Sequence, residues 1–166
     1  MVIDFFKLSD MAGIDLAGHF TSLQKLYNDI DISIDKNLSG VEYPCKSGCN
    51  ECCHESVFLT LIEFIYLWSW AEKNFELQII KQIVTQQLKI FDDNIDDINA
   101  LDRPNIDSEK DHFSIAKEIK FPCPFLNRVG KCSIYPAREL YARLFGVSLN
   151  ENSGIYGCNA CGAFFA

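Results

Sequence analysis

Apolar residues recur at helical spacing in two long stretches of the chain. The first predicts an amphipathic helix that ends near Lys36 and Asn37, with apolar positions at Phe20, Leu23, Leu26, Tyr27, Ile30 and Ile34. The second predicts a helix that continues to about Ile98, with apolar positions at Ile79, Ile80, Ile83, Val84, Leu88, Phe91 and Ile95. Asn74 is a candidate cap for this second helix. The acidic, proline-containing residues 99–112 predict a loop after it.

A further helix is predicted between these two, over about residues 61–73. Thr60-Leu-Ile-Glu63 has the capping-box pattern, in which the Thr hydroxyl accepts a backbone N–H three residues on and the Glu side chain reaches back. Apolar residues run nearly all round this segment, so we expect it at the centre of the protein, with its aromatic side chains in the core. Residues 57–59 before it are expected to form a short strand or an extended lead-in.

Residues 121–135 predict a small β-hairpin. Asn127-Arg-Val-Gly130 suits a turn between Phe125-Leu126 and Cys132-Ser-Ile134, which would place one cysteine on each arm. Pro136 fits the first turn of a following helix, which is expected to stop at Gly146. The sequence therefore predicts a mainly α fold, a compact helical domain with a small β-hairpin.

Composition and charge narrow the class of protein. The 166 residues suit a single domain over residues 1–166, with 48% hydrophobic residues to build a core. The net charge of −8 argues against nonspecific nucleic-acid binding, which needs a basic surface. No apolar run approaches the roughly 18–20 residues that span a bilayer. Residues 1–7 lack the features of a signal peptide, so a cytoplasmic protein is expected.

Eight cysteines provide the candidate chemistry, and a cysteine metal site is therefore added to the predicted fold. The candidate ligands are Cys45, Cys49, Cys52, Cys53, Cys123, Cys132, Cys158 and Cys161. Thiolates are soft ligands for zinc, copper(I) or iron–sulfur clusters, and a tetrahedral ion needs about four of them. Disulfides, which require an oxidising compartment, and inert buried thiols are the alternatives. Metal binding is the favoured interpretation.

The spacing leaves the number of metal sites open. The Cβ atoms of adjacent residues such as Cys52 and Cys53 tend to diverge, so the pair can serve two metals or two edges of one cluster. Eight thiolates suffice for two four-cysteine sites, whereas four complete a single iron–sulfur cluster. Gly48 beside the first Cys-x2-Cys step allows a positive φ at little cost.

Other candidate residues have ordinary interpretations as well as functional ones. His54 can be a nitrogen ligand or a general base, or it can simply pack. Arg138 and Arg143 can stabilise an anion or a thiolate-rich site, or they can be helix charges in surface pairs. His19 is expected to pack or to be exposed, and His112 is left uncommitted. No phosphate-binding or serine-hydrolase motif is present in the sequence.

The cysteine motifs resemble a known family. Cys45-x3-Cys49-x2-Cys52-Cys53, with Pro122-Cys123-Pro-Phe-Leu126, Gly130-x-Cys132-x-Ile-Tyr135 and Arg138, is similar to the YkgJ-type cysteine-cluster family (CxxCxxCC). Members of this bacterial and archaeal family are described as zinc- or iron-chelating proteins. The resemblance covers about residues 45–146. It implies zinc or iron as the cofactor, an iron–sulfur cluster included, and supports as ligands Cys45, Cys49, Cys52, Cys53, Cys123 and Cys132.

The chain departs from the family motif at two positions. The motif usually continues Arg-Pro-x-x-Cys-Arg, but Glu139 stands at the proline and Ala142 at the cysteine. One expected ligand is therefore missing, and we predict that Cys158 or Cys161 replaces it. The predicted function is a metal-binding protein with a multi-cysteine zinc or iron–sulfur site, structural or chelating, with the metal ion as partner. Flagellin lysine methylases carry a similar cluster, so the alternative is an iron–sulfur enzyme or redox protein, methyltransferase-like.

Overall fold

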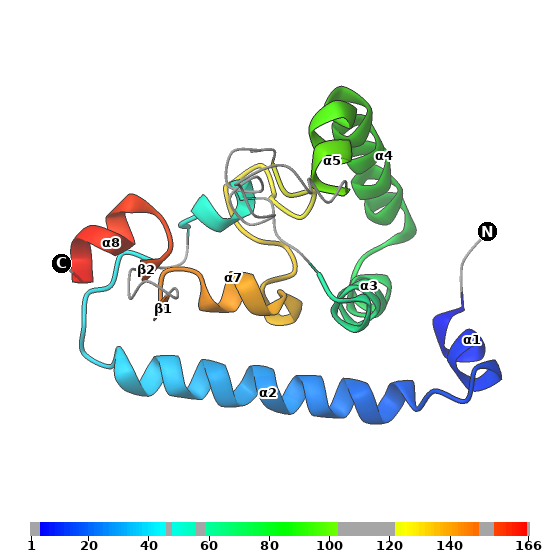
Figure 1. The fold of residues 1–166 in the computed structure, drawn as a ribbon, viewed down its shortest axis with the longest axis horizontal. Coiled ribbons are helices and arrows are strands. Elements are labelled where there is room, and N and C mark those ends of the chain that lie inside the picture. Colours follow the sequence, from blue (N-terminus) through cyan, green and yellow to red (C-terminus); the bar gives the residue numbers. More distant parts are fainter. Residues whose placement is uncertain (1–3, 46–47, 56–58, 103–121, 150–154, 166) are drawn as a thin grey trace.

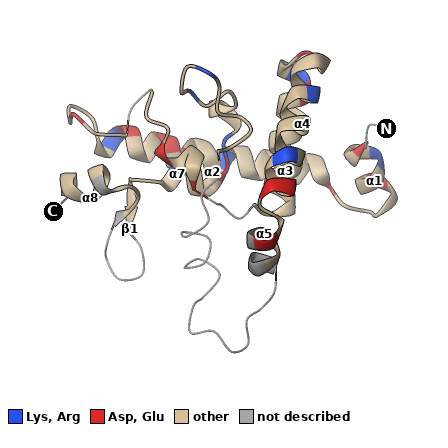
Figure 2. Cartoon of the chain, turned by 90° about the horizontal axis from the view of Figure 1, so that it is seen from above, with Lys and Arg blue, Asp and Glu red and all other residues tan. Residues whose placement is uncertain are grey.

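The computed structural model of the protein describes residues 4–45, 48–55, 59–102, 122–149 and 155–165. As predicted, it is mainly helical. The longest helix, α2 (Leu16–Asn37), runs along one side, and α4 (Leu77–Asp93) lies across its direction in both views (Figures 1 and 2). Helices α1 (Phe5–Met11) and α8 (Asn159–Phe165) lie at opposite ends of the long axis. Acidic and basic residues are scattered over several of the helices drawn in Figure 2.

Two of the predicted helices form close to their expected bounds. α2 ends at Asn37, but it begins four residues before Phe20, because the Asp15 side chain caps it by accepting the Gly18 N–H at 2.9 Å. His19 lies on this helix and is exposed. α3 (Leu61–Asn74) begins with the predicted capping box, in which Thr60 and Glu63 bond each other's backbone.

The capping box allows a test of local stability. We expect Thr60→Ala to cost about 1 kcal/mol in the free energy of unfolding, because the hydroxyl accepts the Glu63 N–H. Urea denaturation measures this loss, and Thr60→Ser, which keeps the hydroxyl, should restore most of it. Metal content per chain should be unchanged in both variants. A fall in metal content would show that Thr60 belongs to the metal site.

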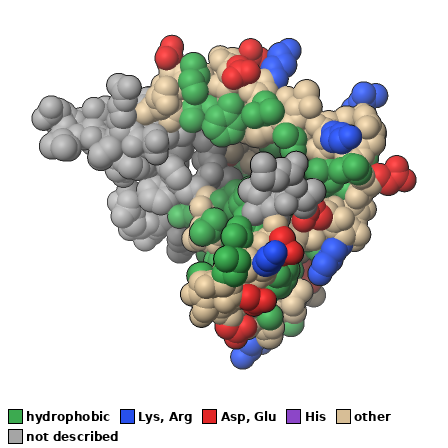
Figure 3. Space-filling view, turned by 90° about the vertical axis from the view of Figure 1, so that its right-hand side faces the viewer, with side chains coloured by type: hydrophobic (Ala, Val, Ile, Leu, Met, Phe, Trp, Pro, Cys, Tyr) green, Lys and Arg blue, Asp and Glu red, His purple; other side chains and the backbone are tan. Residues whose placement is uncertain are grey.

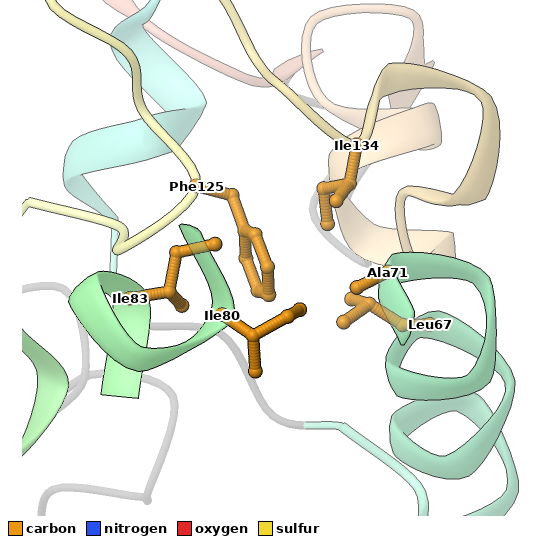
Figure 4. Close-up of a cluster of buried hydrophobic side chains, with 6 residues drawn as sticks. All are labelled: Leu67, Ala71, Ile80, Ile83, Phe125 and Ile134. Atoms are coloured by element: carbon orange, nitrogen blue, oxygen red, sulfur yellow. The ribbon is translucent and has the colours of Figure 1, made fainter. Parts of the chain in front are cut away.

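The core is built where α3 and α4 face the segment between residues 122 and 134. Its six buried members are Leu67, Ala71, Ile80, Ile83, Phe125 and Ile134. In Figure 4 the Phe125 ring points between the side chains of the two helices. Cys123 and Cys132 are half-buried and pack against this cluster. Burial of apolar surface by α3 and α4 therefore also fixes the position of two candidate ligands.

The prediction of one helix up to Ile98 is wrong. The structure has α4 and then α5 (Ile95–Asp102), because the chain turns at Asn94, whose side-chain amide donates to the Ile90 carbonyl at 2.8 Å. Asn74 does not cap α4. It ends α3 and donates to the Trp70 carbonyl at 2.8 Å. The remainder of the predicted loop, with His112, lies outside the described residues, as do residues 57–58.

The predicted β-hairpin is not supported. Its two arms form no strands, and only one isolated bridge joins Leu126 and Cys132. Pro122 and Pro124 flank Cys123 in the first arm and lack the N–H groups that a longer ladder needs. A two-stranded antiparallel pair occurs later, between β1 (Ser148–Leu149) and β2 (Ile155–Tyr156).

The predicted helix from Pro136 to Gly146 is interrupted. It consists of a short 3-10 helix, η2 (Tyr135–Ala137), and α7 (Leu140–Leu144), separated by Arg138 and Glu139, neither of which has a helical conformation. Glu139 caps α7 by accepting the Ala142 N–H at 2.7 Å. Among the described residues, no helix combines the length and apolarity needed to cross a membrane.

Candidate metal centre

The first cysteine segment is held in a tight turn. The 3-10 helix η1 (Glu51–His54) contains Cys52 and Cys53, and the Cys53 N–H donates to the Asn50 carbonyl at 2.9 Å. Gly48 precedes this turn with φ +100°, a conformation that glycine adopts at little cost. Cys53 is buried, whereas Cys49 is exposed. The turn therefore separates a thiol that faces the interior from one near the surface.

A second segment brings Cys123 and Cys132 to this turn. The Cys123 N–H donates to the Cys53 carbonyl at 2.7 Å, which joins the two segments directly. The Asn127 side chain accepts the backbone N–H of Val129 at 3.0 Å and of Lys131 at 2.9 Å, so it closes the loop before Cys132. The loop is thereby fixed with both of its thiols near Cys53.

Four thiols from these two segments interact with one another. The Cys53 thiol is hydrogen-bonded to the thiols of Cys132 and Cys52, and it interacts electrostatically with Cys123. Cys123 also interacts electrostatically with Cys132 and Cys52. We call Cys52, Cys53, Cys123 and Cys132 the inner thiol set. Its members lie up to 80 residues apart in the sequence, so only the fold brings them together.

The other four thiols interact electrostatically, and two of them lie at the start of α8. The sulfur atoms of Cys158 and Cys161 are 3.6 Å apart, and Cys161 is buried, 1% exposed. Cys45 interacts electrostatically with Cys49 and Cys161, and Cys161 with Cys49. We call Cys45, Cys49, Cys158 and Cys161 the tail thiol set. An electrostatic interaction between Cys45 and Cys52 connects it to the inner set.

The thiols of the inner set differ in pKa because their surroundings differ. Hydrogen bonds to Cys132 and Cys52, together with burial, raise the pKa of the Cys53 thiol well above its ordinary value. The hydrogen bond with Cys53, together with the Ile134 backbone N–H and the charge of Arg138, lowers the pKa of Cys132 to about 7. Burial raises the pKa of Cys123 to about 11. The hydrogen bond with Cys53 also lowers the pKa of Cys52. Metals bind the thiolate form, so Cys132 and Cys52 are the inner thiols whose pKa values favour ligation.

Burial likewise disfavours the thiolates of the tail set. It raises the pKa of Cys45 to about 12, with neighbouring thiols adding to the effect, and it raises that of Cys161. A positive ion between such sulfur atoms would offset the repulsion between their thiolates.

The two arginines have different roles. The Arg143 guanidinium is buried, forms an ion pair with Asp31 of α2, and lies 4.1 Å from the centre of the Tyr27 ring. It also donates through Nε to the Arg138 carbonyl at 2.9 Å, so it ties α7 to α2. Arg138 pairs with Asp31 at 3.2 Å and in addition lowers the pKa of Cys52 and Cys132 by its charge. Arg143 therefore supports the fold, and Arg138 also supports the thiolates.

A groove borders the inner set. It has a volume of about 1870 Å³ and is lined in part by six of the eight cysteines, Cys158 and Cys161 being the exceptions. Glu139 and Ala142 line it as well. Figure 3 shows hydrophobic side chains gathered around a hollow on one face of the molecule.

Glu139 is a site residue that the sequence reasoning missed. Its carboxyl group is buried and interacts electrostatically with Cys52. Burial raises its pKa to about 7. Its place at the proline of the family motif marked it as a departure, but an acidic residue at a helix start is also an ordinary cap, so a role at the thiols was not predicted. His54 ends η1 and is half-buried, and its ligation stays a prediction.

The described thiols do not form a preformed coordination shell. Within the described part of the chain, no three His, Cys, Asp or Glu side chains are arranged to hold an ion together. All eight cysteines are free of disulfide bonds. The donor set is thus soft, reduced and grouped, and it fits zinc or iron provided that the sulfur atoms close in on binding.

The comparisons with known proteins agree with this donor set. Residues 44–162 match the family model described as "CxxCxxCC: Putative zinc- or iron-chelating domain". The chain belongs to this family. Membership in the CxxCxxCC family supports a metal-binding role, and the matched range extends past residue 146 to include Cys158 and Cys161. A search of curated proteins finds no match, and a search of solved structures finds none either.

Proposed function

We propose that this CxxCxxCC protein holds zinc or an iron–sulfur cluster through its inner thiol set, in a structural or chelating role. The observation that carries the proposal is the hydrogen bond from the Cys123 N–H to the Cys53 carbonyl, which joins two distant cysteine segments whose thiols interact electrostatically. Such a group of thiols, kept reduced, suits a cytoplasmic location. Bound metal would replace thiol protons and neutralise the charge of the thiolates.

We further propose that the tail thiol set forms a second metal site. Cys158 and Cys161 lie near Cys45 and Cys49, which provides four thiols apart from the inner set. In this proposal the adjacent residues Cys52 and Cys53 both serve the inner set. Cys158 and Cys161 complete a separate site instead of replacing one inner ligand.

Metal analysis of paired variants tests both sites. Protein purified without air should contain zinc, which leaves it colourless, or iron–sulfur clusters, which make it brown. Cys123→Ser with Cys132→Ser should remove the metal of the inner set, and Cys158→Ser with Cys161→Ser that of the tail set. All four changes together should remove both.

Three outcomes decide between these proposals. Wild-type protein without metal contradicts the function itself. Full metal content in the Cys158/Cys161 variant contradicts the tail site alone. Thr60→Ala serves as the control, because it lowers stability without touching a thiol, so its metal content should equal that of the wild type. No comparison supports the enzyme or redox alternative, and a brown protein would be the first result in its favour.

A further inference from the structure

Glu139 is buried with only one of its two carboxyl oxygens in use. The residue is 6% exposed, and Oε1 accepts the Ala142 N–H at 2.7 Å. Oε2 is buried and has no hydrogen-bond partner among the described residues. Leaving a buried carboxylate oxygen unpaired is unfavourable, and native structures contain few such atoms. We therefore expect this oxygen to have a partner, such as a bound ion, in the functional protein.

A neighbouring carboxylate shows that burial by itself does not produce an unpaired oxygen. Glu63 is equally buried, 6% exposed, and interacts with Glu139 electrostatically. Both of its oxygens are satisfied, Oε1 by the Tyr27 hydroxyl and the Leu140 N–H, and Oε2 by Thr60. The fold thus supplies full hydrogen bonding to one buried carboxylate beside α7 and not to the other.

The unpaired oxygen belongs to a residue at the inner thiol set. Glu139 interacts electrostatically with Cys52 and with Cys123, and all three residues line the same groove. These three acidic groups repel one another when ionised, and a cation bound among them would remove that repulsion. Carboxylate oxygen is a regular zinc ligand alongside sulfur, at about 2.0–2.2 Å.

We propose that Glu139 supplies an oxygen ligand, through Oε2, to the metal held by the inner thiol set, beside Cys52 and Cys123. This inference rests on the proposed function of that set. Oε1 remains on the Ala142 N–H, so α7 keeps its cap while the other oxygen binds the ion. The metal shell then contains one hard oxygen donor among soft sulfur donors, which distinguishes it from a site closed by thiolates alone.

Zinc added without air to the metal-free protein is the probe. X-ray absorption of the zinc-loaded wild type should show an oxygen neighbour at about 2.0–2.2 Å together with sulfur at about 2.3 Å. E139Q should lose that oxygen neighbour and bind zinc at least about tenfold more weakly, a loss that is common even for groups that only support a ligand. The Gln amide oxygen can still accept the Ala142 N–H, so E139Q should keep α7.

The matched control is E63Q, which also removes a buried carboxylate but not one beside the thiols. E63Q should keep the zinc affinity and the absorption spectrum of the wild type, whatever its stability. A second readout separates ligation from folding. Without metal, E139Q should melt no lower than the wild type, because it removes a costly buried carboxylate. With zinc, it should melt lower.

The possible failures are distinguishable. Zinc bound through sulfur alone, with equal affinity in E139Q, overturns the Glu139 ligand and leaves the proposed function intact. The Glu139 ligand is also overturned if E139Q and E63Q lose the same zinc affinity. It is likewise overturned if the melting temperature of E139Q falls equally with and without zinc. Wild-type protein that binds no zinc overturns both the ligand and the zinc form of the proposed function.

Discussion

Removal of the metal should lower the melting temperature by tens of degrees, or unfold the protein outright. Structural zinc contributes on the order of 10 kcal/mol to folding, which is comparable to the whole stability of a typical domain. At this chain length each kcal/mol lost lowers the melting temperature by about 2–4 °C. The effect should be large here because the thiols that must be held together come from separate segments around the core. Differential scanning calorimetry with and without a strong chelator measures it.

The control for this experiment is the same chelator saturated with metal beforehand, which should leave the melting temperature unchanged. Elemental analysis must show that the metal has been removed from the treated sample. An unchanged melt of protein shown to be free of metal would contradict the coupling of metal binding to folding.

Gly146→Ala should strongly destabilise the protein near the tail thiol set. Gly146 has φ +82°, and an added Cβ would lie 2.7 Å from the Tyr43 hydroxyl and 2.8 Å from the Cys161 sulfur. The positive φ costs about 1–2 kcal/mol for a residue with a Cβ, and the overpacking adds about 1–3 kcal/mol. Since Cys161 must move, we also expect the variant to lose metal from the tail set. Urea denaturation and metal analysis measure the two effects.

Gly40→Ala is the matched control for this change. Gly40 has nearly the same dihedral angle, φ +78°, but an added Cβ would meet no atom within 4 Å. It should show the backbone cost alone and keep its full metal content. Equal effects of the two substitutions would mean that the contact of Gly146 with Cys161 is unimportant.

Local sequence patterns predicted the parts of the fold that depend on neighbouring residues. The capping box at Thr60 is a contact within four residues, and it formed as predicted together with α3. Arg138 illustrates the opposite case. No local signal ends the helix at Arg138. Instead, Arg138 and Arg143 pair with Asp31, which lies more than 100 residues away in the sequence. Arg138 is not helical, and a new helix is capped by Glu139. Tertiary contacts of this kind override propensity.

Cysteine spacing nominated all eight thiols as ligands, and their ligation of a metal stays a prediction. The grouping into an inner and a tail set could not be predicted and comes from the fold. Spacing could not show that Cys52 and Cys53 lie with Cys123 and Cys132, because that depends on the Cys123 N–H bonding the Cys53 carbonyl. Glu139 was missed because its carboxylate has an ordinary role as a helix cap, and only its second oxygen is unusual.

The distance in sequence between the two halves of the inner set has a consequence for how the protein is made. Cys123 is synthesised 70 residues after Cys53, and a ribosome adds about 5–20 residues per second. The Cys45–Cys53 segment therefore waits about 4–14 seconds before its partner thiols exist. During that time its four thiols can bind metal only among themselves or with small molecules such as glutathione. The inner thiol set is complete only after Cys132 has been translated, so a metal bound by all four of its thiols would be acquired after that point.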